Sequence, residues 1–238
     1  MRSPYGLELI ENCQTCRART NGFFCKLNPN ALRDLEAVKF TNSYPQGAVL
    51  FVEGQASRGV FVLCQGRVKL STSSSEGKTL ILRIARPGEV LGLSATIAGQ
   101  PYEVTAEALH PCQVNFIGRD DFLRLLRLHG EAGLRAVENL SSNYNSVTDQ
   151  LRTLGLAGSA PEKLARLLLE WSEDGEPSPQ GTRVKLGLTH EEIAQFIGTS
   201  RETVTRILSE FRARRLASLR GATLVIQNKA GLENFVGG

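Results

Sequence analysis

The spacing of hydrophobic and polar positions changes twice along this chain of 238 residues. From about Ala37 to Ile117 the apolar residues form short runs, "AVLFVEG", "GVFVLCQGRVKLS", "TLILRIARPGEV", "EVTAEAL" and "CQVNFI", separated by turns that contain glycine. Short β-rich runs at regular spacing are typical of an antiparallel sandwich or barrel. The first half of the chain is therefore predicted to be an antiparallel β-sandwich or β-barrel.

A helical spacing replaces this pattern after residue 118. "GRDDFLRLLRLHG" predicts a short helix and "EAGLRAVENLSSNYNSVTDQLRTLGL" a long one. Apolar residues in the long helix alternate at spacings of three and four, at Val137, Leu140, Tyr144, Val147, Leu151 and Leu154. This is the a/d stripe of a coiled coil, so it predicts pairing with the same helix of a second copy. The alternative to this pairing is that the stripe packs against the β domain of its own chain.

The long helix is predicted to end at "GLAGSAP", where two glycines and a proline interrupt the pattern. Pro161 suits the first position of a new helix because its missing N–H would be unpaired there. "PEKLARLLLEWSED" is then an amphipathic helix, "TRVKLGL" a strand, and "LRGATLVI" a hairpin that turns at Gly221. A second, smaller domain therefore follows the long helix.

The most specific stretch of this second domain is "LTHEEIAQFIGTSRETVTRILSEFRARRL". Thr189 and Glu192 have the spacing of a capping box, which predicts a helix from about His190 to Ile197. Gly198 ends this helix, and another starts near Ser200. Two helices joined by a short turn with glycine make a helix-turn-helix, in which the second helix enters the DNA major groove.

Outward-facing side chains on the second helix have the chemistry to read base edges. Arginine donates two hydrogen bonds to guanine, and a carboxylate accepts one from cytosine. The predicted DNA-contacting residues are Thr199, Ser200, Arg201, Glu202, Thr205 and Arg206. Glu202 also fits a second capping box with Thr199, so capping and base contact both stay open for it. Six arginines against two glutamates between residues 201 and 220 give a local excess of +4, equal to the net charge of the whole chain, which favours a phosphate-facing surface.

Composition narrows the class of protein. The chain is 41% hydrophobic and 22% charged, and it has neither a membrane-length apolar run nor a signal peptide, so we expect a cytoplasmic protein with no membrane contact. We find no paired carboxylates, nucleophile elbow or phosphate-binding loop, and therefore no indication of an enzyme. In a reducing compartment, five cysteines favour metal ligation, reactive thiols or buried packing over disulfides.

The order of parts, together with "GTSRETVTR", resembles the Crp/Fnr family of bacterial transcription regulators over essentially the whole chain. The resemblance implies an α+β fold in three parts. They are a double-stranded β-roll of the jelly-roll kind that is similar to a cyclic-nucleotide-binding domain, a long dimerisation helix, and a winged helix-turn-helix. The predicted boundaries are 1–30 for a cysteine-containing segment, 31–118 for the β-roll, 119–157 for the short helix and dimerisation helix, and 158–238 for the DNA-binding domain. The resemblance also implies that the protein binds palindromic DNA as a homodimer and contacts RNA polymerase. In that family the residues at the positions of Arg201, Glu202 and Arg206 read the bases. Arginine at 201 resembles the cyclic-AMP receptor branch, which reads TGTGA-like half-sites.

The family's nucleotide-binding cassette is altered in this sequence. Members that bind cyclic nucleotides have a glutamate for the ribose and an Arg-Ser pair for the phosphate. Here Leu93 replaces the glutamate, and Tyr102 and Glu103 replace the pair. A leucine accepts no hydrogen bond and Glu103 repels a phosphate, so we expect no cyclic nucleotide to bind.

Cys13, Cys16, Cys25 and Cys112 resemble the four ligands that hold a [4Fe–4S] cluster in the Fnr branch. The resemblance implies a sensor of oxygen, nitric oxide or redox state, although the gap of eight residues between Cys16 and Cys25 is longer than in the well-known oxygen sensors. Cys64 is expected to be a buried core residue. Structural zinc, a thiol switch, and structural cysteines in a regulator that senses another effector in its β-roll are the alternatives.

Overall fold

The computed structural model describes residues 5–16, 22, 24–156, 158–173 and 175–236. It divides into two compact units, one of residues 1–78 and 82–146 and the other of residues 79–81 and 147–238. The division falls inside the long helix α4 (Gly130–Leu156) and not at the predicted boundary after residue 157. The end of α4 joins the second unit because Gln150 donates a hydrogen bond of 2.7 Å to the carbonyl of Phe196.

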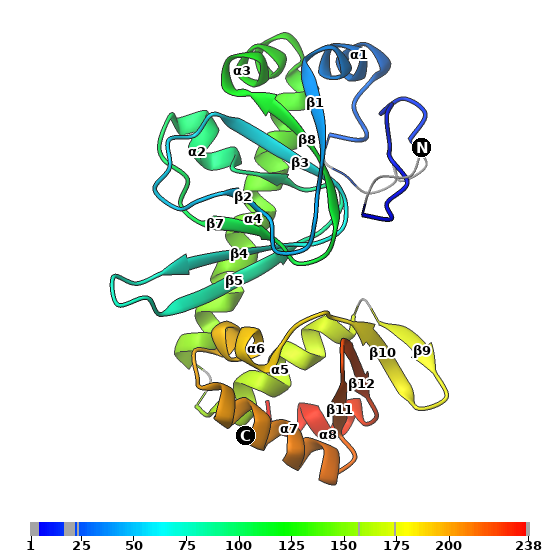
Figure 1. The fold of residues 1–238 in the computed structure, drawn as a ribbon, viewed down its shortest axis with the longest axis vertical. Coiled ribbons are helices and arrows are strands. Elements are labelled where there is room, and N and C mark those ends of the chain that lie inside the picture. Colours follow the sequence, from blue (N-terminus) through cyan, green and yellow to red (C-terminus); the bar gives the residue numbers. More distant parts are fainter. Residues whose placement is uncertain (1–4, 17–21, 23, 157, 174, 237–238) are drawn as a thin grey trace. The chain divides into compact units, whose positions relative to one another are not determined.

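Two antiparallel four-stranded sheets form the β-roll of the first unit (Figure 1). One has the order β1 (Lys39–Tyr44), β8 (Cys112–Gly118), β3 (Gly59–Gln65) and β6 (Val90–Leu91). The other has the order β2 (Val49–Phe51), β7 (Thr105–Ala108), β4 (Val68–Ser73) and β5 (Thr79–Ala85). The predicted β-roll is therefore confirmed.

Buried residues on the two faces of the first sheet belong to different cores. The inter-sheet core contains Phe51, Phe61, Leu63, Val68, Leu70, Ala85, Leu91, Ala95, Tyr102, Ala106, Ala108, Cys112 and Val114. The helix-side core contains Phe24, Leu27, Ala31, Leu32, Leu35, Val60, Val62, Val90, Leu93, Ile117, Phe122, Leu125, Ala132 and Ala136. Successive residues of a strand point to opposite faces, so neighbours on β3 and β8 divide between the two cores.

Helices cover the helix-side core. They are α1 (Pro29–Val38), the predicted short helix α3 (Arg119–Leu128) and the first half of α4, and the short helix α2 (Leu93–Ala98) adds Leu93. Neither α1 nor α2 was predicted from the sequence. Helix α1 begins where the Asn28 side chain accepts hydrogen bonds from the N–H groups of Asn30 and Ala31, with Pro29 in its first turn.

The predicted stripe of α4 is part covered and part exposed. Leu140 packs against the helix-side core, and Val147 and Leu154 are half-buried. Val137, Tyr144 and Leu151 remain 61%, 72% and 64% exposed, and Leu134, one turn before Val137, is 60% exposed. The chain's own fold therefore leaves an apolar strip on α4.

The second unit is a winged helix. It contains the helices α5 (Ala160–Ser172), α6 (His190–Ile197), α7 (Arg201–Ala213) and α8 (Lys229–Glu233). Its sheet has the order β11 (Ala217–Arg220), β12 (Thr223–Ile226), β10 (Gly181–Lys185) and β9 (Glu176–Ser178). Pro161 is the second residue of α5 and not the first, because Ser159 caps the helix by accepting from the Glu162 N–H. Within the described residues, we find no helix with the length and apolarity that crossing a membrane requires.

Candidate functional site

The helix-turn-helix has the local geometry that the sequence predicts. Thr189 Oγ1 accepts from the Glu192 N–H at 3.1 Å, and the Glu192 carboxylate accepts from the Thr189 N–H at 2.9 Å, which completes the capping box. Gly198 then takes a left-handed conformation, with φ of +65°, and ends α6. The next helix, α7, starts at Arg201, three residues after Gly198.

Ser200 caps α7 by accepting from the Thr203 N–H at 3.2 Å. The second capping box considered for Thr199 and Glu202 does not form, because the cap lies at residue 200. Hydrogen bonds from its own backbone N–H and from Ser200, together with the nearby Arg201, lower the pKa of Glu202. The Glu202 carboxylate is therefore ionised at the positive end of α7 and exposed to solvent.

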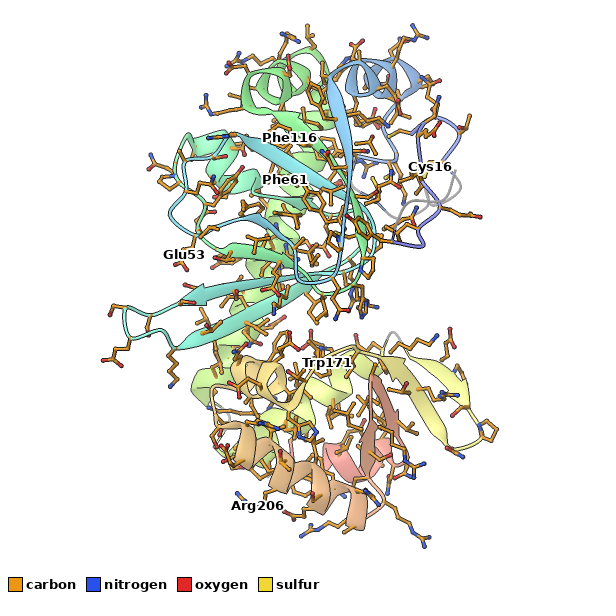
Figure 2. The ribbon with its side chains drawn as sticks, in the orientation of Figure 1. Cys16, Glu53, Phe61, Phe116, Trp171 and Arg206 are labelled. Carbon is orange, nitrogen blue, oxygen red and sulfur yellow. The ribbon has the colours of Figure 1, made fainter. Side chains whose placement is uncertain are left out.

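The two faces of α7 divide as the sequence predicts. Val204, Ile207, Leu208 and Phe211 are buried, whereas Arg201, Glu202, Thr205 and Arg206 are exposed. Figure 2 shows Arg206 projecting from α7 into solvent. The Thr205 hydroxyl donates to the Arg201 carbonyl at 2.9 Å and lies 2.8 Å from His190 Nδ1. Thr205 therefore also links α7 to the start of α6, a role that the sequence did not indicate.

Further arginines extend the positive surface beyond α7. Arg212, Arg214, Arg215 and Arg220 are all exposed. Arg214 pairs with Glu210 at 2.8 Å, so its charge is partly compensated. The exposed face of the winged helix thus combines base-reading chemistry with phosphate-binding charge.

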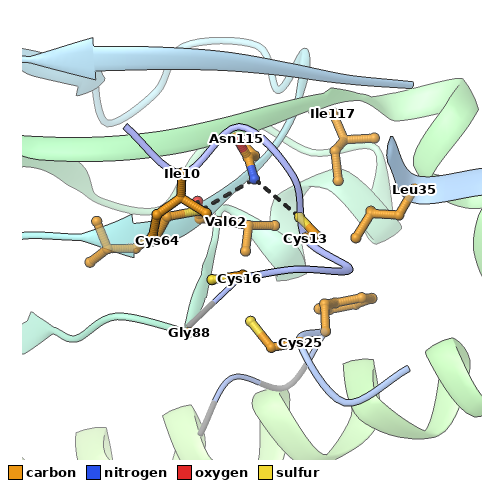
Figure 3. Close-up of a pocket in the computed structure, with 12 residues that line it drawn as sticks. Ile10, Cys13, Cys16, Cys25, Leu35, Val62, Cys64, Gly88, Asn115 and Ile117 are labelled. Atoms are coloured by element: carbon orange, nitrogen blue, oxygen red, sulfur yellow. Dashed lines mark hydrogen bonds between the residues drawn. The ribbon is translucent and has the colours of Figure 1, made fainter. Parts of the chain in front are cut away.

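A second candidate site is a pocket between the N-terminal segment and the β-roll (Figure 3). Its lining consists of Ile10, Cys13, Cys16, Phe24, Cys25, Leu35, Val62, Leu63, Cys64, Gly88, Asn115 and Ile117. The three N-terminal cysteines of the predicted metal set are thus together, as expected. The fourth cysteine beside them is Cys64 and not Cys112.

Cys112 lies fully buried in the inter-sheet core, on the opposite face of the sheet from the pocket. On β8 the residues Cys112 and Val114 face that core, whereas Asn115 and Ile117 face the pocket. Cys64 is half-buried, although the sequence analysis placed it in the core. The structure therefore places Cys64 at the pocket, where Cys112 was expected, and Cys112 in the core, where Cys64 was expected.

Two hydrogen-bond donors reach the sulfur atoms of the pocket. Asn115 Nδ2 lies 3.2 Å from Cys64 Sγ and 3.8 Å from Cys13 Sγ, so that one amide spans both sulfurs (Figure 3). Lys39 Nζ lies 3.5 Å from Cys13 Sγ and forms an ion pair of 2.9 Å with Glu36. The Glu36 carboxylate also accepts from the Cys13 N–H, which ties the N-terminal segment to α1.

Burial keeps these sulfurs in the thiol form. It raises the pKa of Cys13 to about 11 despite the opposing charge of Lys39. Burial, followed by the neighbouring Cys13 and Cys25, raises the pKa of Cys64 to about 12. A reactive thiol switch needs a low pKa, whereas a metal ion displaces thiol protons when it binds. The raised pKa values of Cys13 and Cys64 therefore argue against a thiol switch at these two residues.

The donor set and the lining fit a thiolate-bound metal centre. Four sulfurs border one largely apolar space, which is the ligand number that zinc and a [4Fe–4S] cluster both require. Among the described residues, no three His, Cys, Asp or Glu side chains are close enough to hold one metal ion as they stand. Ligation therefore requires the cysteine sulfurs to approach one another.

The altered nucleotide cassette is built into the cores of the β-roll. Leu93 is buried in the helix-side core. Tyr102 is buried too, stacks on Phe51 and donates a hydrogen bond of 2.7 Å to the Gly59 carbonyl. Glu103 is exposed. The two side chains that replace cassette residues inside the roll thus serve its packing.

Comparison with known proteins gives the family. Residues 41–129 match the cyclic nucleotide-binding domain, and residues 162–235 match the Crp-like helix-turn-helix domain. The chain belongs to the Crp/Fnr family of transcription regulators. It is 26% identical over 192 residues to a global nitrogen regulator of Synechocystis sp., covering 80% of this chain and 85% of the relative.

One further relative and one solved structure are similar over most of the chain. A CRP-like cAMP-activated global transcriptional regulator of Mycobacterium tuberculosis is 25% identical over 212 residues, with coverage of 89% and 94%. The solved structure of FixK2 from Bradyrhizobium japonicum has the same fold, with a TM-score of 0.74, 22% identity and coverage of 84% and 98%. As a Crp/Fnr protein with a Crp-like helix-turn-helix, the chain is a DNA-binding transcription regulator and not an enzyme.

Proposed function

We propose that this Crp/Fnr regulator binds palindromic DNA as a homodimer and senses oxygen, nitric oxide or redox state through a [4Fe–4S] cluster held in the cysteine pocket. The observation that carries the sensing role is the gathering of Cys13, Cys16 and Cys25 with a strand cysteine around one apolar pocket. The observation that carries DNA reading is the exposed row of Arg201, Glu202 and Arg206 on α7.

The apolar strip of α4 supports the homodimer. Val137, Tyr144 and Leu151 recur at heptad spacings and are each more than 60% exposed. A parallel copy of the same helix would bury these residues against their counterparts. A two-fold dimer presents two recognition helices, which suits two half-sites about 34 Å apart. We expect TGTGA-like half-sites and contact with RNA polymerase, both from the family resemblance.

Residues of this chain would hold the cluster as thiolates and offset its charge. Bound there, an iron–sulfur cluster would supply reactivity toward oxygen and nitric oxide. Lys39 carries a positive charge beside Cys13, and Asn115 donates toward Cys13 and Cys64. Such donors around the ligands adjust the stability and the potential of a metal site.

A continuous core connects the pocket to α4. Cys13 packs against the helix-side core, which also contains Phe24, Phe122 of α3 and Ala132 of α4. The Phe24 and Phe122 rings are 5.8 Å apart. Because the N-terminal segment and α4 share this core, a shift of the segment changes the surface on which α4 rests. A coupling of about 1–3 kcal/mol would change DNA affinity about 5- to 150-fold.

A polar contact reinforces this connection. The backbone N–H and the side-chain amide of Asn28 both donate to the Glu131 carboxylate, at 3.2 Å and 3.1 Å. Asn28 also caps α1, and Glu131 lies in the first turn of α4. The segment that follows Cys25 is therefore bound directly to the start of the dimerisation helix.

Protein purified without oxygen tests the sensing role. Iron, sulfide and zinc are assayed on one sample, and visible spectra are recorded before and after exposure to air. About four irons and four sulfides per chain, with a band that bleaches in air, are expected. Colourless protein with one zinc, or protein that binds no metal after reconstitution, would contradict the sensing role.

DNA binding is measured separately, by fluorescence anisotropy on an inverted repeat of TGTGA and on a scrambled duplex. A clear preference for the repeat is expected, and affinity for both duplexes should fall as salt rises. Equal affinity for the two duplexes would overturn the predicted half-site. The protein is measured with and without its metal. A preference for the repeat in either state reports DNA reading, whereas a difference in affinity between the two states reports sensing.

A further inference from the structure

The β-roll offers two cysteines to the N-terminal segment, and its strand geometry selects between them. Val60 and Val62 of β3 belong to the helix-side core, and Cys64 continues the same face after two further residues. On β8, Cys112 shares the opposite face with Val114 in the inter-sheet core. The sheet itself thus lies between the Cys112 side chain and the pocket.

A local irregularity of β3 favours Cys64. The ladder pairs Leu63 with Val114 and then Gln65 with Gln113, so the register shifts at Cys64. Bulges of this kind turn a side chain away from the regular ladder and occur often beside functional sites. Gln65, the next residue, donates to the Glu8 carbonyl, so this end of β3 already holds the N-terminal segment.

Bringing Cys112 to the pocket would require a change in the whole strand. Strand side chains alternate, so a register slip of one residue would exchange every side chain of β8 between the two faces. Val114 would leave the inter-sheet core, and Asn115 would enter it. Gln113 would also lose its hydrogen bonds to the backbone of Ile10, whose N–H donates at 2.8 Å and whose carbonyl accepts at 2.6 Å.

The surroundings of Cys64 are those of a ligand. Its sulfur shares the Asn115 amide with Cys13, which places two sulfurs from distant parts of the sequence about one donor. A buried side chain with this role orients ligands, and loss of such partners weakens metal binding about 10- to 100-fold. Asn115 is 3% exposed and comes from β8, which fixes its position.

We propose that Cys64, and not Cys112, supplies the fourth thiolate of the metal site, and that the Asn115 amide holds the Cys13 and Cys64 sulfurs together. The inference rests on the metal-binding role proposed above and names the ligand set of that site. The site then joins three thiolates of the N-terminal segment to one of strand β3.

Two probes are used. The charge-transfer absorption of cobalt(II) counts the thiolates around a single ion, and the iron and sulfide content reports a cluster, in which each of four irons takes one cysteine. Full-length wild-type protein, Cys64→Ala and Cys112→Ala are titrated anaerobically, and iron and sulfide are measured after reconstitution. In Cys64→Ala the charge-transfer intensity per cobalt is expected to fall by about a quarter, from four thiolates to three. Cobalt affinity should fall at least tenfold, because the loss of a residue that only contacts a ligand already weakens metal binding about 10- to 100-fold. Cys112→Ala should match the wild type in both.

A variant with a relocated thiol distinguishes the loss of a ligand from the loss of the folded structure. Asn115 lies against both sulfurs, so Asn115→Cys combined with Cys64→Ala returns a thiol to the same side of the pocket. This double variant is expected to regain the fourth charge-transfer increment, which a merely destabilised protein would not. Circular dichroism establishes that each variant is folded.

The outcomes separate the two proposals. Wild-type protein that shows neither thiolate–cobalt absorption nor uptake of iron and sulfide contradicts the proposed sensing site itself. Wild-type protein that binds cobalt through four thiolates, with Cys64→Ala unchanged and Cys112→Ala reduced, overturns the assignment of Cys64 alone. Equal loss in both variants overturns it too, because Cys112 would then be needed as well.

Discussion

Replacing Leu151 by glutamine tests the dimer interface on α4. Leu151 is 64% exposed in the single chain, so this share of its surface is available for burial by a second copy. Complete burial of a leucine side chain is worth about 1.5–3 kcal/mol, which leaves about 1–2 kcal/mol for each copy. A two-fold interface contains the residue twice, so the free energy of dimerisation should weaken by about 2–4 kcal/mol. The dimer Kd would rise about 30- to 1,000-fold.

Glutamine is chosen because its helix propensity is close to that of leucine, so α4 itself is not weakened. Sedimentation equilibrium over a range of protein concentrations measures the dimer Kd. Arg152→Gln is the matched control, since Arg152 is the next residue and its side chain is 68% exposed in a surface pair with Asp149. That pair is worth less than about 1 kcal/mol. If both variants dimerise like the wild type, or if the wild type stays monomeric, the reasoning about α4 is refuted.

Three further substitutions test other parts of the argument. Arg206→Ala should cost about 1–3 kcal/mol on the TGTGA repeat and relax specificity at one position, as measured by competition with single-base variants; an equal loss on scrambled DNA would argue against base reading. Gly22→Ala places a methyl group 2.5 Å from Cys25 Sγ and 2.8 Å from Gly88 Cα, so it should displace the N-terminal segment and lower metal content, and unchanged metal content with unchanged protease sensitivity would show that the contact is unimportant. For Glu36, burial alone would raise the pKa, but hydrogen bonds from Cys13 and Lys39 lower it below its ordinary value of 4.5. This carboxylate therefore contributes stability that is present above about pH 4.5 and is lost as pH falls through the native pKa. Glu36→Gln should remove this part of the acid response of segment cleavage by a protease, and an identical pH profile would contradict it.

The winged helix was predictable because its signals are local. The hydroxyl of Thr189 and the carboxylate of Glu192 satisfy backbone donors within one turn, and Gly198 supplies the left-handed residue that ends the helix. These effects depend on neighbours in sequence and not on the rest of the fold. The predicted bounds of α6 therefore agree with the structure residue for residue.

Helix α1 carried comparable signals that were not used. Asn28 is a favoured cap and Pro29 suits the first turn, but the β pattern that follows is the stronger signal in this part of the sequence. Ten residues are fewer than the roughly 11 to 18 over which a helical spacing of apolar residues is recognised. What stabilises α1 is the burial of Ala31, Leu32 and Leu35 in a core made by distant strands and helices.

The choice between Cys64 and Cys112 was only half visible in the sequence. The residues Val60 to Leu63 are apolar on both faces of β3, so they give no sign of the direction in which Cys64 points. On β8 the alternation is readable, because the polar Gln113 and Asn115 mark the face that turns toward the N-terminal segment. Cys112 falls on the other face, where apolar neighbours place it between the sheets. The family resemblance outweighed this simpler argument.

The burial of Phe24 and Leu27 limits how far a change at the cysteines can move the N-terminal segment. Both side chains are 1% exposed in the helix-side core. Removing them from it would cost about 3–6 kcal/mol, which exceeds the coupling that a regulator needs. The part of the N-terminal segment that contains Phe24 and Leu27 should therefore stay packed in the helix-side core whether or not metal is bound. The regulatory change should then be a small shift of the segment and not its dissociation from the core. Its sensitivity would then be adjustable by substitutions at Phe24, a residue with no redox chemistry of its own.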